Sequence, residues 1–146
     1  MSQFTCKVIH IALTPLAGSP IRIVRALNTH TNIAARLLTV NEYSSATGFS
    51  FPADLCWWMK EDRAAFSQAL EAADVIHLHH WMDLENNPLG INFSRHLSRG
   101  KKIIRQFHSN PKAVAHHADR ACRSMGHRQG PGGWLMCRGA GRGRPR

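Results

Sequence analysis

The sequence predicts an α/β protein built on an open, Rossmann-like parallel sheet with helices on both faces. Short apolar runs rich in β-branched residues alternate along the chain with segments whose apolar residues recur at helical spacing. The chain of 146 residues, 43% of them hydrophobic and 19% charged, has the size and composition of a single globular domain. Alternating strands and helices form parallel sheets, which bind ligands at the carboxyl ends of their strands. We therefore expect the site residues to follow strands.

The first half of the predicted sheet contains two strands joined by a helix. The run KVIHIAL, Lys7–Leu13, is the first strand. In the loop TPLAGSP that follows it, Ser19 is expected to cap a helix that begins at Pro20, since proline has no N–H to leave unsatisfied in the first turn. This helix continues through IRIVRALN, residues 21–28, and the second strand is ARLLTV, Ala35–Val40.

The second half of the sheet follows an irregular segment. Residues 41–60 contain Gly, Pro and a pair of tryptophans that interrupt any period, so they are expected to hold at most one short strand. Apolar residues then recur at i, i+3, i+4 and i+7 in a helix over 62–73, which precedes the strand DVIHLH at 74–79. Another helix is expected from Asn87-Pro88 to Gly100, where a left-handed residue commonly ends a helix. KKIIRQF, Lys101–Phe107, is the last strand.

The carboxyl-terminal part of the chain differs in composition from the body. The net charge is +10, yet residues 1–110 hold 11 Lys and Arg against 8 Asp and Glu, whereas residues 111–146 hold 8 against 1. The last stretch, GPGGWLMCRGAGRGRPR, is mostly Gly, Arg, Pro and Ala, which cannot bury enough apolar surface to fold. We therefore predict a folded domain over 1–111 and a disordered Gly/Arg-rich tail over 112–146. Because these residue types share GC-rich codons, the chain is expected to leave its ancestral reading frame between Lys112 and Gly130.

Membrane-spanning, secreted and disulfide-linked proteins are not expected. No apolar run approaches the ~20 residues that cross a bilayer, and the first residues do not form a secretory signal. The chain is therefore expected to be soluble and cytoplasmic, with at most a peripheral contact with membranes. Its cysteines are scattered without a C-x-x-C pair, which predicts reduced thiols rather than disulfides or a zinc knuckle. These are Cys6, Cys56, Cys122 and Cys137.

The stretch DVIHLHHW, Asp74–Trp81, contains three histidines. Side chains alternate along a strand, so His77 and His79 are expected to share one face and His80 to point to the other. The pair could ligate zinc, but a metal site needs three or four ligands and no third one is fixed by spacing, so no metal site is expected. His77 is predicted to be a hydrogen-bonded core residue, with His79 or His80 either lining the strand end or contacting a ligand there.

Three segments carry a resemblance to a known family. They are KVIHIALTPLAGSP, with a small-residue loop after the first strand, ALEAADVIHLHHW, and KKIIRQFHSNP, a strand that ends in a histidine. In this order and spacing, from Lys7 to Pro111, they resemble the amino-terminal domain of retaining glycosyltransferases of the GT-B architecture, in particular the family 4 group that builds bacterial polysaccharides and lipopolysaccharide. The resemblance implies that the chain is the acceptor-side, incomplete half of such an enzyme.

The resemblance also implies roles for individual residues. His108 stands where the family carries a histidine that touches the donor sugar or the leaving phosphate, which makes it the candidate catalytic residue. Gly18 and Ser19 are the candidate contacts of the first loop with a phosphate or sugar oxygen, although the sequence alone fits a tight strand-to-helix turn equally well. The other predicted substrate-binding residues are His79, His80 and Asn110.

The partner implied by the resemblance is an acceptor glycan or lipid-linked sugar, and neither a metal nor another cofactor is implied. In the family a second, carboxyl-terminal domain holds the nucleotide sugar through paired carboxylates. No comparable element is found here, so the chain is expected to be inactive alone and to meet a nucleotide sugar only when such a domain is supplied.

Two other functions stay open for the sequence. One is a non-catalytic interaction module with a Rossmann-like body, and the other is an RNA binder that acts through the Arg/Gly tail. Nucleic acid is not expected as the main partner, because the folded part is nearly neutral. Arg22 and Arg25 lie on the outer side of the first helix and are expected to be solvated rather than to contact phosphates.

Overall fold

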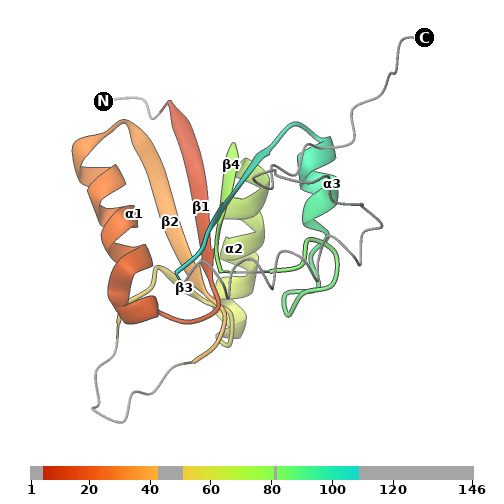
Figure 1. The fold of residues 1–146 in the computed structure, drawn as a ribbon, viewed down its shortest axis with the longest axis horizontal. Helices are drawn as coiled ribbons and strands as arrows, with labels where there is room; N and C mark the ends of the chain where they lie inside the picture. The colour runs from red at the N-terminus through yellow and green to blue at the C-terminus, as the bar shows by residue number, and fades with distance from the viewer. Residues whose placement is uncertain (1–4, 43–50, 81, 109–146) are drawn as a thin grey trace, which may run out of the picture. The chain divides into compact units, whose positions relative to one another are not determined.

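The computed structural model describes residues 5–42, 51–80 and 82–108. The sheet of this part of the chain has five strands, all parallel, in the order β3-β2-β1-β4-β5 (Figure 1). The predicted α/β fold with an open, Rossmann-like parallel sheet is confirmed. The predicted tail over 112–146, together with Cys122 and Cys137, lies outside the described residues. The strands are β1 (Cys6–Ala12), β2 (Ile33–Thr39), β3 (Leu55–Cys56), β4 (Val75–His79) and β5 (Lys102–Gln106).

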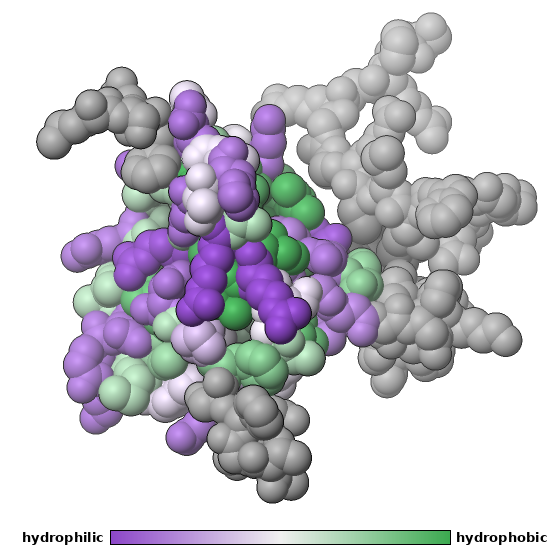
Figure 2. All heavy atoms as spheres, turned by 90° about the vertical axis from the view of Figure 1, so that its left-hand side faces the viewer, coloured by the Kyte–Doolittle hydropathy of each residue, from purple (hydrophilic) through white to green (hydrophobic). Residues whose placement is uncertain are grey.

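One face of the sheet is covered by α1 (Ser19–His30) (Figure 1). Ile21 and Val24 lie on its inner side and pack in one cluster with Leu37 of β2 and Ala12 of β1. Its outer side is polar, as its helical period requires: Arg22 and Arg25 are exposed, as predicted. Hydrophilic side chains accordingly fill much of the centre of this side of the molecule in Figure 2.

The opposite face carries α2 (Lys60–Ala72) and α3 (Phe93–Ser98). Alternate residues of a strand face opposite sides, so the odd-numbered Ile9 and Ile11 of β1 turn away from α1. They pack with Phe66 of α2 and Phe93 of α3 in the larger apolar core. The side chains of β1 are therefore covered from both faces, as expected for the central strand of a parallel sheet.

The start of α1 differs from the prediction. The helix begins at Ser19 rather than Pro20. Its N-cap is Gly18, which has no side chain and therefore makes no side-chain capping hydrogen bond. A one-turn 3₁₀ helix, η1 (Leu16–Gly18), leads directly into it. Gly18 can fill the cap position because its φ of +77° lies in the left-handed region, where residues with a Cβ are strained.

The predicted helix from Asn87-Pro88 to Gly100 is wrong over its first half, because α3 begins only at Phe93. The Asn87 side chain bonds the backbone of its own loop instead: its Nδ2 donates to the carbonyl oxygens of Asp83 and Ile91, and its Oδ1 accepts from the N–H groups of Leu89 and Ile91. Such local bonds compete with helix formation. The predicted end is correct, since Gly100 has a φ of +90° and its N–H donates to the Leu97 carbonyl.

Two further expectations can be compared with the described residues. Cys6 and Cys56 are free thiols. No helix in the described ranges has both the length and the apolar character needed to cross a bilayer.

Candidate functional site: a histidine cluster

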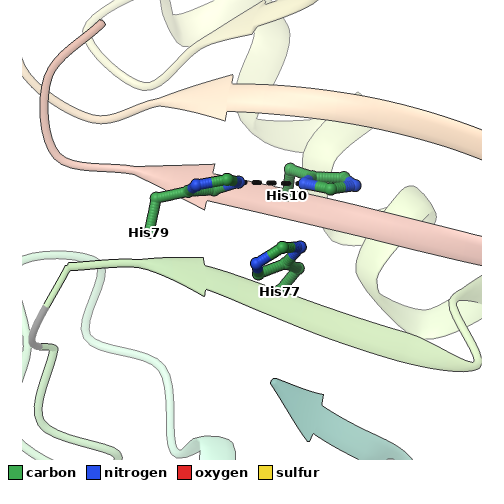
Figure 3. Close-up of side chains that lie close together, drawn as sticks. All are labelled: His10, His77 and His79. Atoms are coloured by element: carbon green, nitrogen blue, oxygen red, sulfur yellow. Dashed lines mark hydrogen bonds between the residues drawn. The ribbon is translucent and has the colours of Figure 1, made fainter. Parts of the chain in front are cut away.

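Pairing of β1 with β4 assembles a cluster of histidines on the α1 face of the sheet. In the parallel register His10 of β1 is opposite His77 of β4, and Ala12 is opposite His79. Cross-strand partners lie on the same face, as do residues two apart in one strand, so three imidazoles converge (Figure 3). We call His10, His77 and His79 the histidine triad.

The rings of the triad are in direct contact. Nδ1 of His10 lies 2.9 Å from Nε2 of His79, within hydrogen-bonding distance, and this contact is the dashed line in Figure 3. The His77 ring stacks on that of His79 with centroids 4.3 Å apart and is tilted against that of His10 at 4.6 Å. Each ring therefore touches both others.

His108, the candidate catalytic residue, extends the triad toward the end of β5. Its Nε2 lies 3.1 Å from Nδ1 of His79, which places His79 between His10 and His108 in a continuous chain of imidazoles. His80 reaches the same place, with its ring centroid 5.8 Å from that of His108. The expectation that His80 points to the other face of the strand is wrong, because β4 ends at His79 and His80 has a φ of +88° that breaks the alternation.

The environment keeps the imidazoles of the triad and of His80 neutral. Burial, with the nearby His77 second, lowers the pKa of His10 to about 3. Burial followed by repulsion from four other histidines also lowers the pKa of His79 to about 3. Burial is the first cause of the lowered pKa of His77 and His80 as well. A neutral imidazole has one N–H donor and one free lone pair, so each ring can donate and accept one bond.

Burial within the triad is greatest at His10 and His79 rather than at His77. His10 and His79 are 0% and 1% exposed, whereas His77, predicted to be the core residue, is half-buried. The reason is their place in the sheet, because His10 lies on the central strand and His79 is covered by His10 on one side and His108 on the other. His79 uses both ring nitrogens inside the protein, so it is poorly placed to contact a sugar directly.

The loop after β1 is closed on itself. The N–H of Gly18 donates to the Pro15 carbonyl and the N–H of Ser19 to that of Leu16, so both groups predicted to face a phosphate are already bonded. A Cβ built on Gly18 would lie 2.7 Å from Cδ1 of Phe51, which covers the glycine. The glycine is thus explained by its backbone and by this close approach, and Ser19 retains its half-buried hydroxyl as a possible contact.

Of the remaining predicted site residues, Asn110 lies outside the described part of the chain. The residue that the sequence reasoning missed is His10. Its signal was a single histidine in the middle of an otherwise apolar strand, KVIHIAL. A buried polar side chain in such a run needs a polar partner, and here that partner is a histidine from the neighbouring strand.

No protein-family model matches the chain, and neither a curated protein nor a solved structure is similar enough to count as a match. The fold and the site define a Rossmann-like α/β protein with a histidine cluster near the carboxyl ends of β1, β4 and β5. Its function has to be inferred from this cluster.

Proposed function

We propose that this chain is the acceptor-side domain of a retaining glycosyltransferase and that it binds a glycan or lipid-linked sugar at the carboxyl edge of its sheet. The observation that supports this proposal is the meeting of His79, His80 and His108, which come from the ends of β4 and β5. Ligands of open parallel sheets bind at such edges. The GT-B resemblance of the three strand-loop segments supplies the class of ligand.

In this proposal His80 and His108 contact the sugar, and His79 holds His108 in place. His80 and His108 are both half-buried, so part of each side chain stays available to a ligand. The lowered pKa of His80 keeps its ring neutral at physiological pH, with one donor and one acceptor to offer. Sugar hydroxyls also both donate and accept, so the neutral imidazole of His80 matches them well.

The nucleotide sugar is assigned to a separate domain, as the resemblance implies, and the chain works in polysaccharide biosynthesis. The cytoplasm is the proposed location, because the nucleotide-sugar donor would be met there. Alone, the chain is expected to bind UDP-, GDP- and ADP-sugars only weakly and to transfer no sugar.

The test is saturation-transfer NMR on the full chain with a panel of oligosaccharides from bacterial polysaccharides and lipopolysaccharide cores. We expect binding that His108→Ala weakens at least 10-fold while the melting temperature changes little. His30→Ala is the matched control, because His30 is exposed at the end of α1. Failure of every oligosaccharide to bind, or binding unaffected by His108→Ala, would refute the proposal. Micromolar affinity for a nucleotide sugar would refute the assignment of the donor to another domain.

A further inference from the structure

Two nitrogens of the histidine triad are buried and lack a hydrogen-bond partner among the described residues: Nε2 of His10 and Nε2 of His77. Buried polar atoms are nearly always bonded, so each such atom calls for an explanation. Packing does not supply one, since an apolar side chain of similar size would avoid the cost of burying the nitrogen. An unprotonated imidazole nitrogen in this position is, however, a ligand for a transition metal.

The spacing of the triad fits one metal ion. One nitrogen from each ring can be chosen so that all three lie within 4.8 Å of one another. Zinc binds histidine nitrogen at about 2.0–2.1 Å, so tetrahedral ligands stand roughly 3.4 Å apart. The limit of 4.8 Å is longer than this separation, so the rings would have to move toward the ion. A ligand set that uses Nε2 of His79 also gives up its 2.9 Å contact with Nδ1 of His10.

We propose that His10, His77 and His79 form a binding site for one divalent transition-metal ion, with Zn²⁺ as the best match. Three imidazoles with no sulfur or carboxylate favour zinc, copper or nickel over calcium and magnesium, which require oxygen ligands. Three protein ligands leave a fourth position for water. On the β5 side, Ile104, the register partner of His77, is 49% exposed, so solvent reaches the sheet beside the triad.

The surroundings of the triad resemble those of metal ligands. Metal-bound histidines usually donate their second N–H to a neighbouring group, which fixes the orientation of the ring. Nδ1 of His79 has such a partner in Nε2 of His108, and the His77 ring is hydrogen-bonded by the Gln106 side chain.

This site goes beyond the proposed glycan-binding function, since its ligands are His10, His77 and His79 of β1 and β4 rather than His80 and His108. Its test needs no sugar. Full-length chain is stripped with a chelator and titrated with Zn²⁺ alone in competition with a chromophoric chelator. We expect one ion per chain, bound with submicromolar affinity, and a loss of affinity of at least 100-fold in His77→Gln, because one of three ligands is removed.

Two controls separate the triad from other histidines. His30→Gln removes an exposed histidine and His96→Gln a buried one on α3, and both should keep the wild-type affinity within about threefold. No Zn²⁺ binding to the folded wild type, or binding retained in His77→Gln, would overturn the proposal.

A measurement on the wild type alone covers the case in which the His77→Gln variant does not fold. Zinc K-edge X-ray absorption of the loaded chain should show three imidazole nitrogens and no sulfur in the first coordination shell. A shell that contains sulfur would place the ion at Cys6 or Cys56 or another cysteine and would overturn the proposal. Fewer than three imidazoles would do the same.

Discussion

His10 is the residue that turns a pair of strand histidines into a cluster. The sequence places His77 and His79 on one face correctly, because the side-chain period of a strand is fixed. It cannot place His10 beside them, because that contact depends on which strands pair and in what register. No described carboxylate acts on the pKa of His10 or His79. Burial and neighbouring histidines alone lower both pKa values.

The same burial predicts how stability depends on pH. His10 and His79 have a folded-state pKa of about 3, against 6.5 as the ordinary value. Between these values the unfolded chain binds protons that the folded chain does not, so acid favours unfolding. The free energy of unfolding of the metal-free chain should be largest above pH 6.5, fall as the pH drops from 6.5 toward 3, and lose this dependence below 3.

Urea unfolding with a chelator present, at about pH 7.5, 6.5 and 5.5, measures this slope. His10→Gln should be less sensitive to acid than the wild type, because one of the two strongly shifted groups is gone. His30→Gln should keep the wild-type slope, since His30 is exposed and distant in sequence from the triad. Equal slopes for wild type and His10→Gln would show that the burial of His10 does not control acid sensitivity.

At the scale of single elements, periodic segments were predictable and the loop before α3 was not. The helix α2 and the strands β1 and β4 follow from their apolar periods, and their ends lie within two residues of those expected. The conformation of the loop depends on the side chain of Asn87. This side chain makes four hydrogen bonds, all with backbone groups no more than four residues away. The four-residue spacing of Leu89, Phe93 and Leu97 predicts a helix and does not reveal that these loop bonds compete with it.

Asn87 is therefore expected to matter more than Asn92, the N-cap of α3. Asn92 makes one capping bond, from the N–H of Arg95 to its Oδ1 at 2.9 Å, so Asn92→Ala should cost about 1 kcal/mol. Asn87→Ala removes four bonds in a partly buried loop and should cost roughly 2–3 kcal/mol.

Chemical denaturation of the two variants, with the exposed Asn86→Ala as control, gives both values. Asn86→Ala should lie within about 0.5 kcal/mol of the wild type, as expected for a surface position. A larger loss for Asn92→Ala than for Asn87→Ala would mean that the helix cap, not the loop, holds this region together.

At the scale of the whole described unit, the fold class was predictable but the order of the strands was not. Alternating strands and helices dictate a parallel sheet, yet the chain could place its first strand at an edge or at the centre. The observed order puts β1 between β2 and β4, and this choice brings the ends of β1, β4 and β5 together. The histidine cluster is thus a consequence of topology, which local sequence patterns do not contain.

The strand order also predicts how stability is distributed over the sheet. β1 is hydrogen-bonded on both sides and covered on both faces, so its amides should exchange only when the whole unit unfolds. β5 pairs with β4 alone among the described strands, and Ile104 on it is 49% exposed. Every second N–H of a parallel edge strand points away from its neighbour, so opening β5 breaks few bonds.

Hydrogen exchange followed by NMR compares the two strands directly. The amides of Ile9–Ala12 should exchange at least 10-fold more slowly than those of β5, and a core-weakening variant such as Ile11→Val should accelerate the β1 amides, because they report global unfolding. The β5 amides should change little in that variant, since they open locally. Equal protection of β1 and β5 would show that β5 does not open locally and that the sheet unfolds as one unit.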